Sequence, residues 1–511
     1  MSKSTTVAKN TLFLYFRMIL TMGISIYTSR VILKELGVED FGIYSVVGGV
    51  VGLLNFFTNT MATSYQRFFC VEIANGNSLG LRSMIGTALS VSGIWSIVVL
   101  LLAETLGLWL VWEKLVIPED KHFVALVVYQ LSILTFIVTL FQSIYSAAII
   151  SFERMNFFAY VSIVEAALKL GVAFSLQWIP TNRLLIYGIL MLASHLVIFL
   201  SYQLFCFRKF EECKTFFSFK KENIKKLFSF SSWTLIGTFA NVFQTQGASI
   251  LLNLFFGPVV NAARALSFQI YTAVTTFTRG FQTAFSPTMI KTYENKDYSM
   301  TIRQLMTSSK LSFFLVFLLA IPIFLNTQSL LSLWLGAENV PEYTAEFIKW
   351  IILIGMLEVL ASPIVNIIYA KGEIKWFQIV IGVVNILVLP MAYVILKLEA
   401  VPNPLIVYYV TIGFCVLTQF IRLIFLAKAL SFGLWNYCRE VILPVVFFSL
   451  ILFFINRIFP TEDIETFYNY IGALIVSEVG SIVLIYFLFL SSDEKGFVDN
   501  LFKKCVRIFA K

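Results

Sequence analysis

Residues 257–290 read GPVVNAARALSFQIYTAVTTFTRGFQTAFSPTMI, a stretch long and apolar enough to cross a bilayer, and it contains Arg264 and Arg279. An arginine at the centre of a membrane helix costs roughly 3 kcal/mol on insertion scales. At about 100° per residue, the two arginines fall within about 60° of one helical face and about 22 Å apart along the axis. We therefore expect a membrane helix whose cationic stripe has a function.

Polar residues continue this stripe at helical spacing. Tyr271 lies between the two arginines, and Gln282 lies beyond Arg279 on the same face. The competing interpretation is that the arginines extend to the lipid headgroups, as long cationic side chains do near helix ends. That interpretation suits Arg264, which lies near one end of the stretch, better than it suits Arg279.

The composition of the whole chain indicates a membrane protein. Hydrophobic residues make up 59% of its 511 residues and charged residues only 13%, and the mean hydropathy is +0.84. This excludes a soluble globular fold and predicts an all-α polytopic membrane protein. The chain opens directly into an apolar segment without a small-residue cleavage site, so we expect no removed signal peptide.

Charges, glycines and prolines divide the chain into about 14 predicted spans. They lie roughly at 11–33, 41–69, 83–112, 122–151, 156–178, 184–207, 225–256, 258–290, 307–335, 344–370, 376–396, 405–430, 440–459 and 468–490. The net charge of +9 comes from lysines and arginines scattered through short loops, which favours membrane orientation over nucleic-acid binding.

The positive-inside rule predicts the orientation of the spans. Most lysines and arginines of the loops and tails, such as Lys220, Lys221 and Lys310, fall on one side of the membrane. Both termini lie on that same side, so we place them in the cytoplasm. None of the six cysteines falls in an outward loop, so we expect no disulfide. The Cys and His spacing predicts no metal site, and nothing in the sequence calls for a cofactor.

An internal repeat organises the chain. A shift of 220 residues aligns Leu36 and Gly37 with Phe256 and Gly257, and the same offset holds across six spans. We therefore predict an N-terminal lobe at 1–213 (helices 1–6), a C-terminal lobe at 214–435 (helices 7–12), and a final part at 436–511 with helices 13 and 14 and a cytoplasmic amphipathic tail. A solvated tail is the alternative for residues 491–511. Transporters built from such repeats bind their substrate between the halves.

The first two helices of each predicted half carry polar stripes. The members most suited to line a cavity are Arg17 on the first span, Asn55 and Asn59 on the second, Asn241 and Thr245 on the seventh, and Arg264, Tyr271, Arg279 and Gln282 on the eighth. Interhelical packing is the alternative role for such Ser, Thr and Asn residues. Stripes at repeat-equivalent positions favour a shared water-filled cavity.

Intramembrane charges predict what this cavity binds. None of the four striped helices contains a carboxylate in its span, so the cavity is cationic and suited to a diphosphate, which guanidinium groups bind through paired hydrogen bonds. Glu165, Glu358 and Glu478 lie in other spans and are candidates for ion coupling. Glu165 has a second interpretation, a pair with Lys169 four residues on, and His195 is expected to be a packed helix residue.

The opening TLFLYFRMILTMGISIYTSRVILKELGVEDFGIYSVVGGVVGLLNFFTNTMATSYQRFF, residues 11–69, carries a family resemblance, most clearly in the G-hxxFGhY element at residues 37–44. The chain resembles the polysaccharide-transport branch of the MATE-like (MOP) flippase superfamily, the Wzx-type O-antigen flippases and their lipid II flippase relatives. This resemblance implies two six-helix lobes in a V around a cationic cavity. Arg17, Arg264 and Arg279 match the cavity arginines of the family in kind and location, whereas the second helix lacks a central arginine, so Asn55 and Asn59 would serve there.

The resemblance also implies a function. The expected activity is that of a flippase, not an enzyme, which moves an undecaprenyl-diphosphate-linked oligosaccharide of O-antigen, capsule or exopolysaccharide to the outer leaflet of the bacterial inner membrane. The implied partners are this substrate, the bilayer, and a polysaccharide polymerase with its chain-length machinery. Two alternatives stay open: a cation-coupled drug exporter that uses Glu165 or Glu358, and a membrane enzyme of polysaccharide assembly. Short outward loops disfavour the enzyme.

Overall fold

The computed structural model confirms the predicted helical fold. It describes residues 3–372, 374–430, 433–449, 478–491, 494–496 and 499. The predicted spans at 440–459 and 468–490 therefore lie partly outside the described residues, as does most of the predicted amphipathic tail. Among the residues that the structure describes there is no β-strand.

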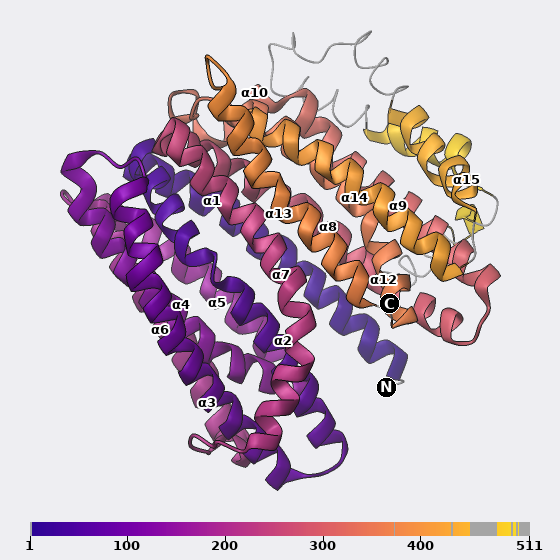
Figure 1. The fold of residues 1–511 in the computed structure, drawn as a ribbon, viewed down its shortest axis with the longest axis horizontal. Helices are drawn as coiled ribbons and strands as arrows, with labels where there is room; N and C mark the ends of the chain where they lie inside the picture. The colour runs from indigo at the N-terminus through magenta and orange to yellow at the C-terminus, as the bar shows by residue number, and fades with distance from the viewer. Residues whose placement is uncertain are drawn as a thin grey trace. The chain divides into compact units, whose positions relative to one another are not determined.

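Fifteen α-helices are described (Figure 1). They are α1 (Lys3–Gly52), α2 (Asn55–Ala74), α3 (Ser78–Leu102), α4 (His122–Ser151), α5 (Met155–Ser175), α6 (Arg183–Lys209), α7 (Lys221–Phe256), α8 (Pro258–Glu294), α9 (Tyr298–Leu325), α10 (Thr327–Leu335), α11 (Thr344–Val359), α12 (Ala361–Lys371), α13 (Ile374–Leu398), α14 (Ile406–Leu430) and α15 (Leu434–Tyr437). Short π and 3-10 segments continue or join them at Ala103–Gly107, Leu110–Lys114, Glu119–Lys121, Leu176–Trp178, Glu211–Cys213, Ala337–Asn339, Cys438–Ile442 and Ile485–Phe489.

Eight helical segments of the described chain are long and apolar enough to cross a membrane, and a bent pair formed by α1 from Arg17 and α2 makes a ninth. The two parts of that pair differ in direction by 52°. The helices α7 and α8 are not among these segments, because their polar stripes reduce their apolar character. The count of 14 spans stays a prediction.

The chain divides into two compact units. The first contains Met1–Gln269, Leu331–Phe347 and Gln378–Val410, and the second contains Ile270–Leu330, Ile348–Phe377 and Thr411–Lys511. Within the first unit, α4 packs along α6 and α2, α5 packs along α1, and α7 packs against α1 and α2 (Figure 1). The lobe boundaries at residues 213 and 435 stay predictions.

Buried aromatic residues anchor both units. In the first unit, Tyr65 and Tyr129 are fully buried, and their hydroxyl groups bond to the Ser92 hydroxyl at 2.9 Å and the Ala103 carbonyl at 2.8 Å. These bonds offset the cost of burying polar atoms in an apolar core. In the second unit, the rings of Phe314 and Phe448 meet edge to face at 5.1 Å between centroids.

The backbone repeats the offset of 220 residues that the sequence predicts. Gly37 interrupts α1 with φ 80° and ψ 166°, and Gly257 precedes α8 with φ 78° and ψ −170°. A positive φ of this size is accessible to glycine without a steric penalty. The two glycines therefore form the same local break in corresponding parts of the chain.

A second pair of turns repeats at the same offset. Asn77 caps α3 by accepting a bond from the Gly80 amide at 2.9 Å, and Asp297 caps α9 by accepting one from the Met300 amide at 3.1 Å. The backbone amide of Asn77 donates to the backbone carbonyl of Glu72, and the backbone amide of Asp297 donates to that of Thr292, both at 3.0 Å. Shared bonding at equal spacing supports the internal repeat beyond the matches in sequence.

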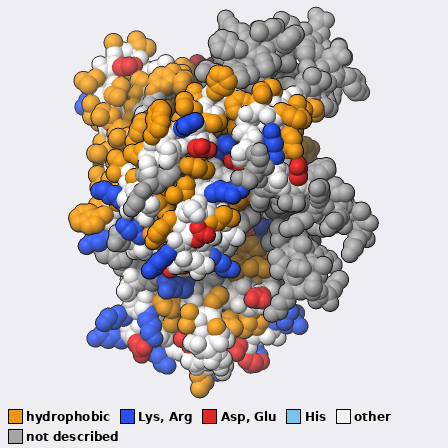
Figure 2. All heavy atoms as spheres, turned by 90° about the vertical axis from the view of Figure 1, so that its right-hand side faces the viewer, with side chains coloured by type: hydrophobic (Ala, Val, Ile, Leu, Met, Phe, Trp, Pro, Cys, Tyr) orange, Lys and Arg blue, Asp and Glu red, His pale blue; other side chains and the backbone are white. Residues whose placement is uncertain are grey.

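The surface has the apolar character of a membrane protein. Figure 2 shows hydrophobic side chains over much of the upper part of one face, with many Lys and Arg side chains toward its middle and lower part. Large apolar side chains on α4, α6 and α14, including Leu134, Leu200 and Phe420, are exposed. Contact with lipid would cover such surfaces.

Candidate functional site

Arg17 lines a polar cavity of about 440 Å³ in the first unit, among α1, α5 and α6. Its Nη1 atom donates a hydrogen bond to the Ser162 hydroxyl at 3.1 Å, and the guanidinium lies 5.3 Å from the centre of the Phe158 ring. Its Nε atom is buried and has no hydrogen-bond partner among the described residues. An arginine offers five N–H donors, so this guanidinium keeps capacity for a ligand.

The ion pair predicted between Glu165 and Lys169 is confirmed, with 2.7 Å between the Lys169 Nζ and Glu165 Oε1 atoms. Both residues line the same cavity as Arg17. Two cationic groups and one carboxylate leave the cavity with one net positive charge. The cavity therefore favours an anionic group. Its carboxylate, Glu165, comes from α5, which is not one of the four helices with polar stripes.

Hydroxyl groups on α1 complete the wall of this cavity. Thr21 and Thr28 line it and donate their protons to the carbonyls of Arg17 and Ile24, at 2.9 and 2.7 Å. Each hydroxyl oxygen keeps lone pairs for a further hydrogen bond. The cavity thus combines a partly unpaired guanidinium with hydrogen-bond acceptors.

Arg264 has a different environment, because it is buried with 7% of its surface exposed. Its Nε donates to the Ser249 hydroxyl at 2.8 Å and its Nη2 to the Thr245 carbonyl at 2.6 Å. Both partners lie on α7, so the guanidinium joins α8 to α7 within the first unit. This placement supports a structural role, which was neither of the two roles considered for Arg264 from the sequence.

In the second unit, the structure brings two candidates together. The Tyr271 hydroxyl donates a hydrogen bond to the Glu358 carboxylate. Gln282 is buried and donates to the Val359 carbonyl at 2.9 Å. Gly355 makes room for the tyrosine, because a Cβ atom there would lie 3.1 Å from its ring. Tyr271 and Gln282 therefore connect α8 to the segment formed by α11 and α12.

The remaining candidates differ in exposure. Asn59, Asn241 and Arg279 are exposed, and Thr245 is half-buried and donates to the Asn241 carbonyl at 3.0 Å. Glu478 is half-buried, and its Oε1 atom has no hydrogen-bond partner in the part of the chain that the structure describes. Asn55 is the only candidate of α2 that lines one of the cavities described in the first unit.

Reasoning from the sequence did not identify Ser162 or the hydroxyls of Ser132, Thr135 and Thr139 on α4 as cavity residues. The spacing of the α4 hydroxyls, at steps of three and four, was the available signal. Among the described residues, no group of three or more His, Cys, Asp or Glu side chains could hold a metal ion.

Solved structures share this fold. The chain is similar to an inward-facing multidrug resistance MATE family transporter of the MOP superfamily, with 11% identity, a TM-score of 0.67, and coverage of 81% of this chain and 99% of the other. It is equally similar to the lipid II flippase MurJ in an inward closed conformation, with 12% identity, a TM-score of 0.67, and coverage of 94% and 99%. A MOP superfamily transporter from Pyrococcus furiosus matches with 12% identity, a TM-score of 0.54, and coverage of 83% and 96%.

Family models match large parts of the sequence, whereas no curated protein matches it. The MatE model matches residues 235–394. The polysaccharide biosynthesis protein model matches residues 7–293, which is more than half of the chain and includes α2 to α7 and nearly all of α1 and α8. The protein is a multi-pass membrane protein with the fold of the MOP superfamily, and it belongs to the polysaccharide biosynthesis protein family.

Proposed function

We propose that the protein is a flippase for a lipid-linked oligosaccharide whose sugar and lipid are joined by a diphosphate. The observation that carries this proposal is the cavity around Arg17, where a buried Nε atom lacks a partner among the described residues and the lining has one net positive charge. A guanidinium in a site of low dielectric binds phosphate oxygens more strongly than in water. Membership of the polysaccharide biosynthesis protein family supports a sugar-bearing cargo.

The repeat supports an alternating-access mechanism. Two lobes that exchange an inward-open for an outward-open arrangement would expose the headgroup first to one side and then to the other, while the lipid tail stays in the bilayer. Arg279, Asn59 and Asn241 are exposed on α8, α2 and α7 and are proposed to contact the headgroup during this exchange. Asn55 is proposed to contact the sugar.

We place the protein in the bacterial inner membrane with both termini in the cytoplasm. The lysines and arginines of the loops support this orientation. A polymerase and chain-length machinery would then use the product on the outer surface. The family and the transporter fold favour transport over catalysis, so we propose no enzymatic activity.

A second function has support from the MatE model and from the shared fold with a MATE transporter. In a cation-coupled exporter, Glu358 or Glu478 would be the ion-coupling acid. Glu165 is less suited, because it is already paired with Lys169.

Reconstitution distinguishes the two functions. Purified protein in liposomes is expected to move a polyprenyl-diphosphate-linked sugar from the inner to the outer leaflet, measured as access of the sugar to a lectin added outside. Protein-free liposomes give the background rate. Efflux of a cationic dye driven by a proton or sodium gradient, without transfer of the lipid-linked sugar, would overturn the flippase and support the exporter.

A further inference from the structure

A second polar cavity, of about 300 Å³, lies in the first unit next to the Arg17 cavity. The two cavities share Lys169 and Met191 in their walls. Residues from α1, α2, α4, α5 and α6 surround the second cavity, and its polar lining includes Asn55, Ser132, Thr135, Thr139, Lys169 and His195. We call it the hydroxyl-lined cavity. Its volume lies at the lower end of the range for small-ligand pockets.

The three hydroxyl groups of α4 have already used their protons. Ser132 donates to the Val128 carbonyl at 2.8 Å, Thr135 to the Leu131 carbonyl at 2.8 Å, and Thr139 to the Thr135 carbonyl at 2.9 Å. A hydroxyl has one proton and two lone pairs. These oxygens therefore offer acceptors, and not donors, to a ligand in the cavity.

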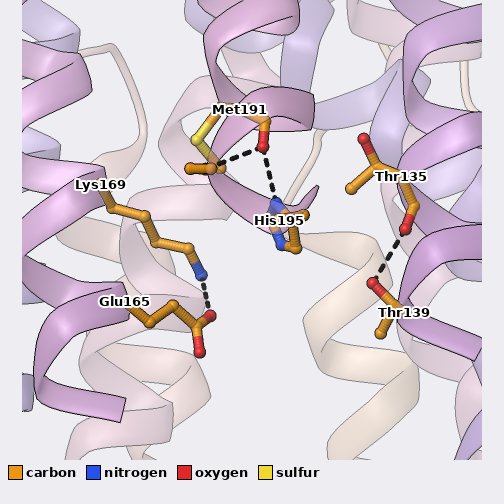
Figure 3. A network of polar contacts seen from close by, with 7 residues as sticks. Thr135, Thr139, Glu165, Lys169, Met191 and His195 are labelled. Carbon is orange, nitrogen blue, oxygen red and sulfur yellow. Dashed lines mark hydrogen bonds and ion pairs between the residues drawn. The ribbon is translucent and has the colours of Figure 1, made fainter. Parts of the chain in front are cut away.

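His195 adds another acceptor. Its Nδ1 atom lies 2.8 Å from the Met191 carbonyl oxygen. A carbonyl only accepts, so Nδ1 carries the proton of this bond and the Nε2 atom of the neutral ring keeps a lone pair. Figure 3 shows the His195 ring between the Glu165–Lys169 pair on one side and Thr135 and Thr139 on the other.

The chemistry of the wall selects a class of ligand. Several acceptors require a ligand rich in donors, which leaves a cation or a polyhydroxyl compound. Lys169 lies in this wall while its partner Glu165 does not, so the wall disfavours a cation. The Lys169 ammonium and the Asn55 amide can donate to the oxygens of a neutral compound. Tyr44 and Phe136 supply aromatic surface for the C–H faces of a ring.

We propose that the hydroxyl-lined cavity binds one sugar of the lipid-linked headgroup and determines which sugar the protein accepts. This inference rests on the proposed function. A diphosphate bound at Arg17 would place the sugar attached to it next to the shared Lys169. A site built to hydrogen-bond substrate hydroxyls discriminates strongly against analogues that lack them.

The test measures binding of soluble substrate analogues to the purified full-length protein by isothermal titration calorimetry. The probes are farnesyl diphosphate and a set of farnesyl-diphosphate-linked sugars that includes glucose, galactose, N-acetylglucosamine and a 6-deoxyhexose. In the unchanged protein, at least one sugar is expected to raise the affinity above that of farnesyl diphosphate. The double variant Thr135→Val with Thr139→Val should weaken binding of that probe about tenfold and leave farnesyl diphosphate unaffected.

The control variant is Thr105→Val. Thr105 also donates to a carbonyl of its own helix, that of Leu101 at 2.6 Å, and it does not line the cavity. It should leave both affinities unchanged, and thermal unfolding of each variant checks that the fold is intact. A His195→Gln variant, which retains hydrogen-bonding groups, should change the order of preference among the sugars.

Each other outcome is decisive. The assignment of the sugar site is wrong if no sugar raises the affinity above that of farnesyl diphosphate, or if the double variant weakens binding of both probes equally. The diphosphate site stands in either case. If the protein binds neither probe, the proposed function fails as well. If the double variant leaves sugar binding unchanged, the sugar assignment is overturned.

Discussion

Lys310 and Glu494 form a buried ion pair in the second unit, with 2.7 Å between Nζ and Oε2 and only 6% of each side chain exposed. Lys310 lies on α9, and Glu494 belongs to the described C-terminal residues. The Ser491 amide donates to the Glu494 carboxylate at 2.8 Å and the Glu494 amide donates to the Ser491 hydroxyl at 3.4 Å, which is the reciprocal pattern of a capping box. The pair therefore fixes the start of the C-terminal segment to α9.

Lys310→Met should destabilise the protein by about 3 kcal/mol, because it leaves the Glu494 carboxylate buried without its partner. Thermal unfolding in detergent measures the loss. Adding Glu494→Leu to that variant should recover most of the stability, since an apolar pair of similar volume often replaces a buried ion pair at little cost. Lys226→Met, which breaks an ion pair with Glu222 at an exposed site, is the control and should have little effect. An equal effect of both single variants would contradict the assignment.

Arg17→Ala should abolish surface polysaccharide in cells that depend on this protein, because it removes the partly unpaired guanidinium of the cavity. Immunoblotting of membranes must show normal protein levels. Arg17→Lys should restore only part of the activity, since an ammonium keeps the charge and loses the planar fork that grips two phosphate oxygens. Full activity of Arg17→Ala would remove Arg17 from the site.

Arg264→Ala should reduce stability by about 3 kcal/mol, because it deletes two charge-assisted hydrogen bonds that join α8 to α7. The midpoint of thermal unfolding measures the change. Arg264→Lys should lose less, because one ammonium can still reach one of the two acceptors. A variant that unfolds like the unchanged protein but fails in transport would instead assign Arg264 to the substrate.

Arg279→Ala should impair transport and leave stability unchanged, in contrast to Arg264→Ala. The side chain is exposed on α8, so its removal should leave the unfolding midpoint unchanged and abolish transport of a diphosphate-linked substrate. Transport in liposomes and thermal unfolding of the same preparation provide the comparison with Arg264→Ala. Normal transport would exclude Arg279 from headgroup binding.

Gly42→Ala should destabilise the first unit by about 2 kcal/mol. A Cβ atom at this position would lie 1.9 Å from the Pro258 carbonyl oxygen, so the start of α8 and α1 would have to separate. Gly171→Ala on α5 is the matched control, because a Cβ atom there would have no atom within 4 Å apart from its chain neighbours and the backbone of its own helix. At an exposed position in a helix, alanine is more stable than glycine, so the control should be as stable as the unchanged protein or slightly more so.

Some features of the site could be predicted from the sequence because they depend on neighbours along one helix. The pair of Glu165 with Lys169 follows from a spacing of four residues, and the positive φ at Gly37 and Gly257 follows from glycine at equivalent positions in a repeat. The shared helical face of Thr135 and Thr139 could be predicted from their spacing in the same way. The spacing does not show which neighbouring helix faces them, so they resembled ordinary packing residues.

The sequence by itself determined the membrane-embedded helical fold, the internal repeat and the presence of costly arginines, since these depend on apolar content and periodicity. Only the tertiary structure decided what the charged groups contact on other helices. Arg17 lines a cavity, and its Nε has no partner among the described residues, whereas Arg264 is buried with two partners on α7. Lys310, expected on the cytoplasmic side, is buried against Glu494. Long side chains reach across helices, so their burial and partners are set by packing between segments distant in the chain.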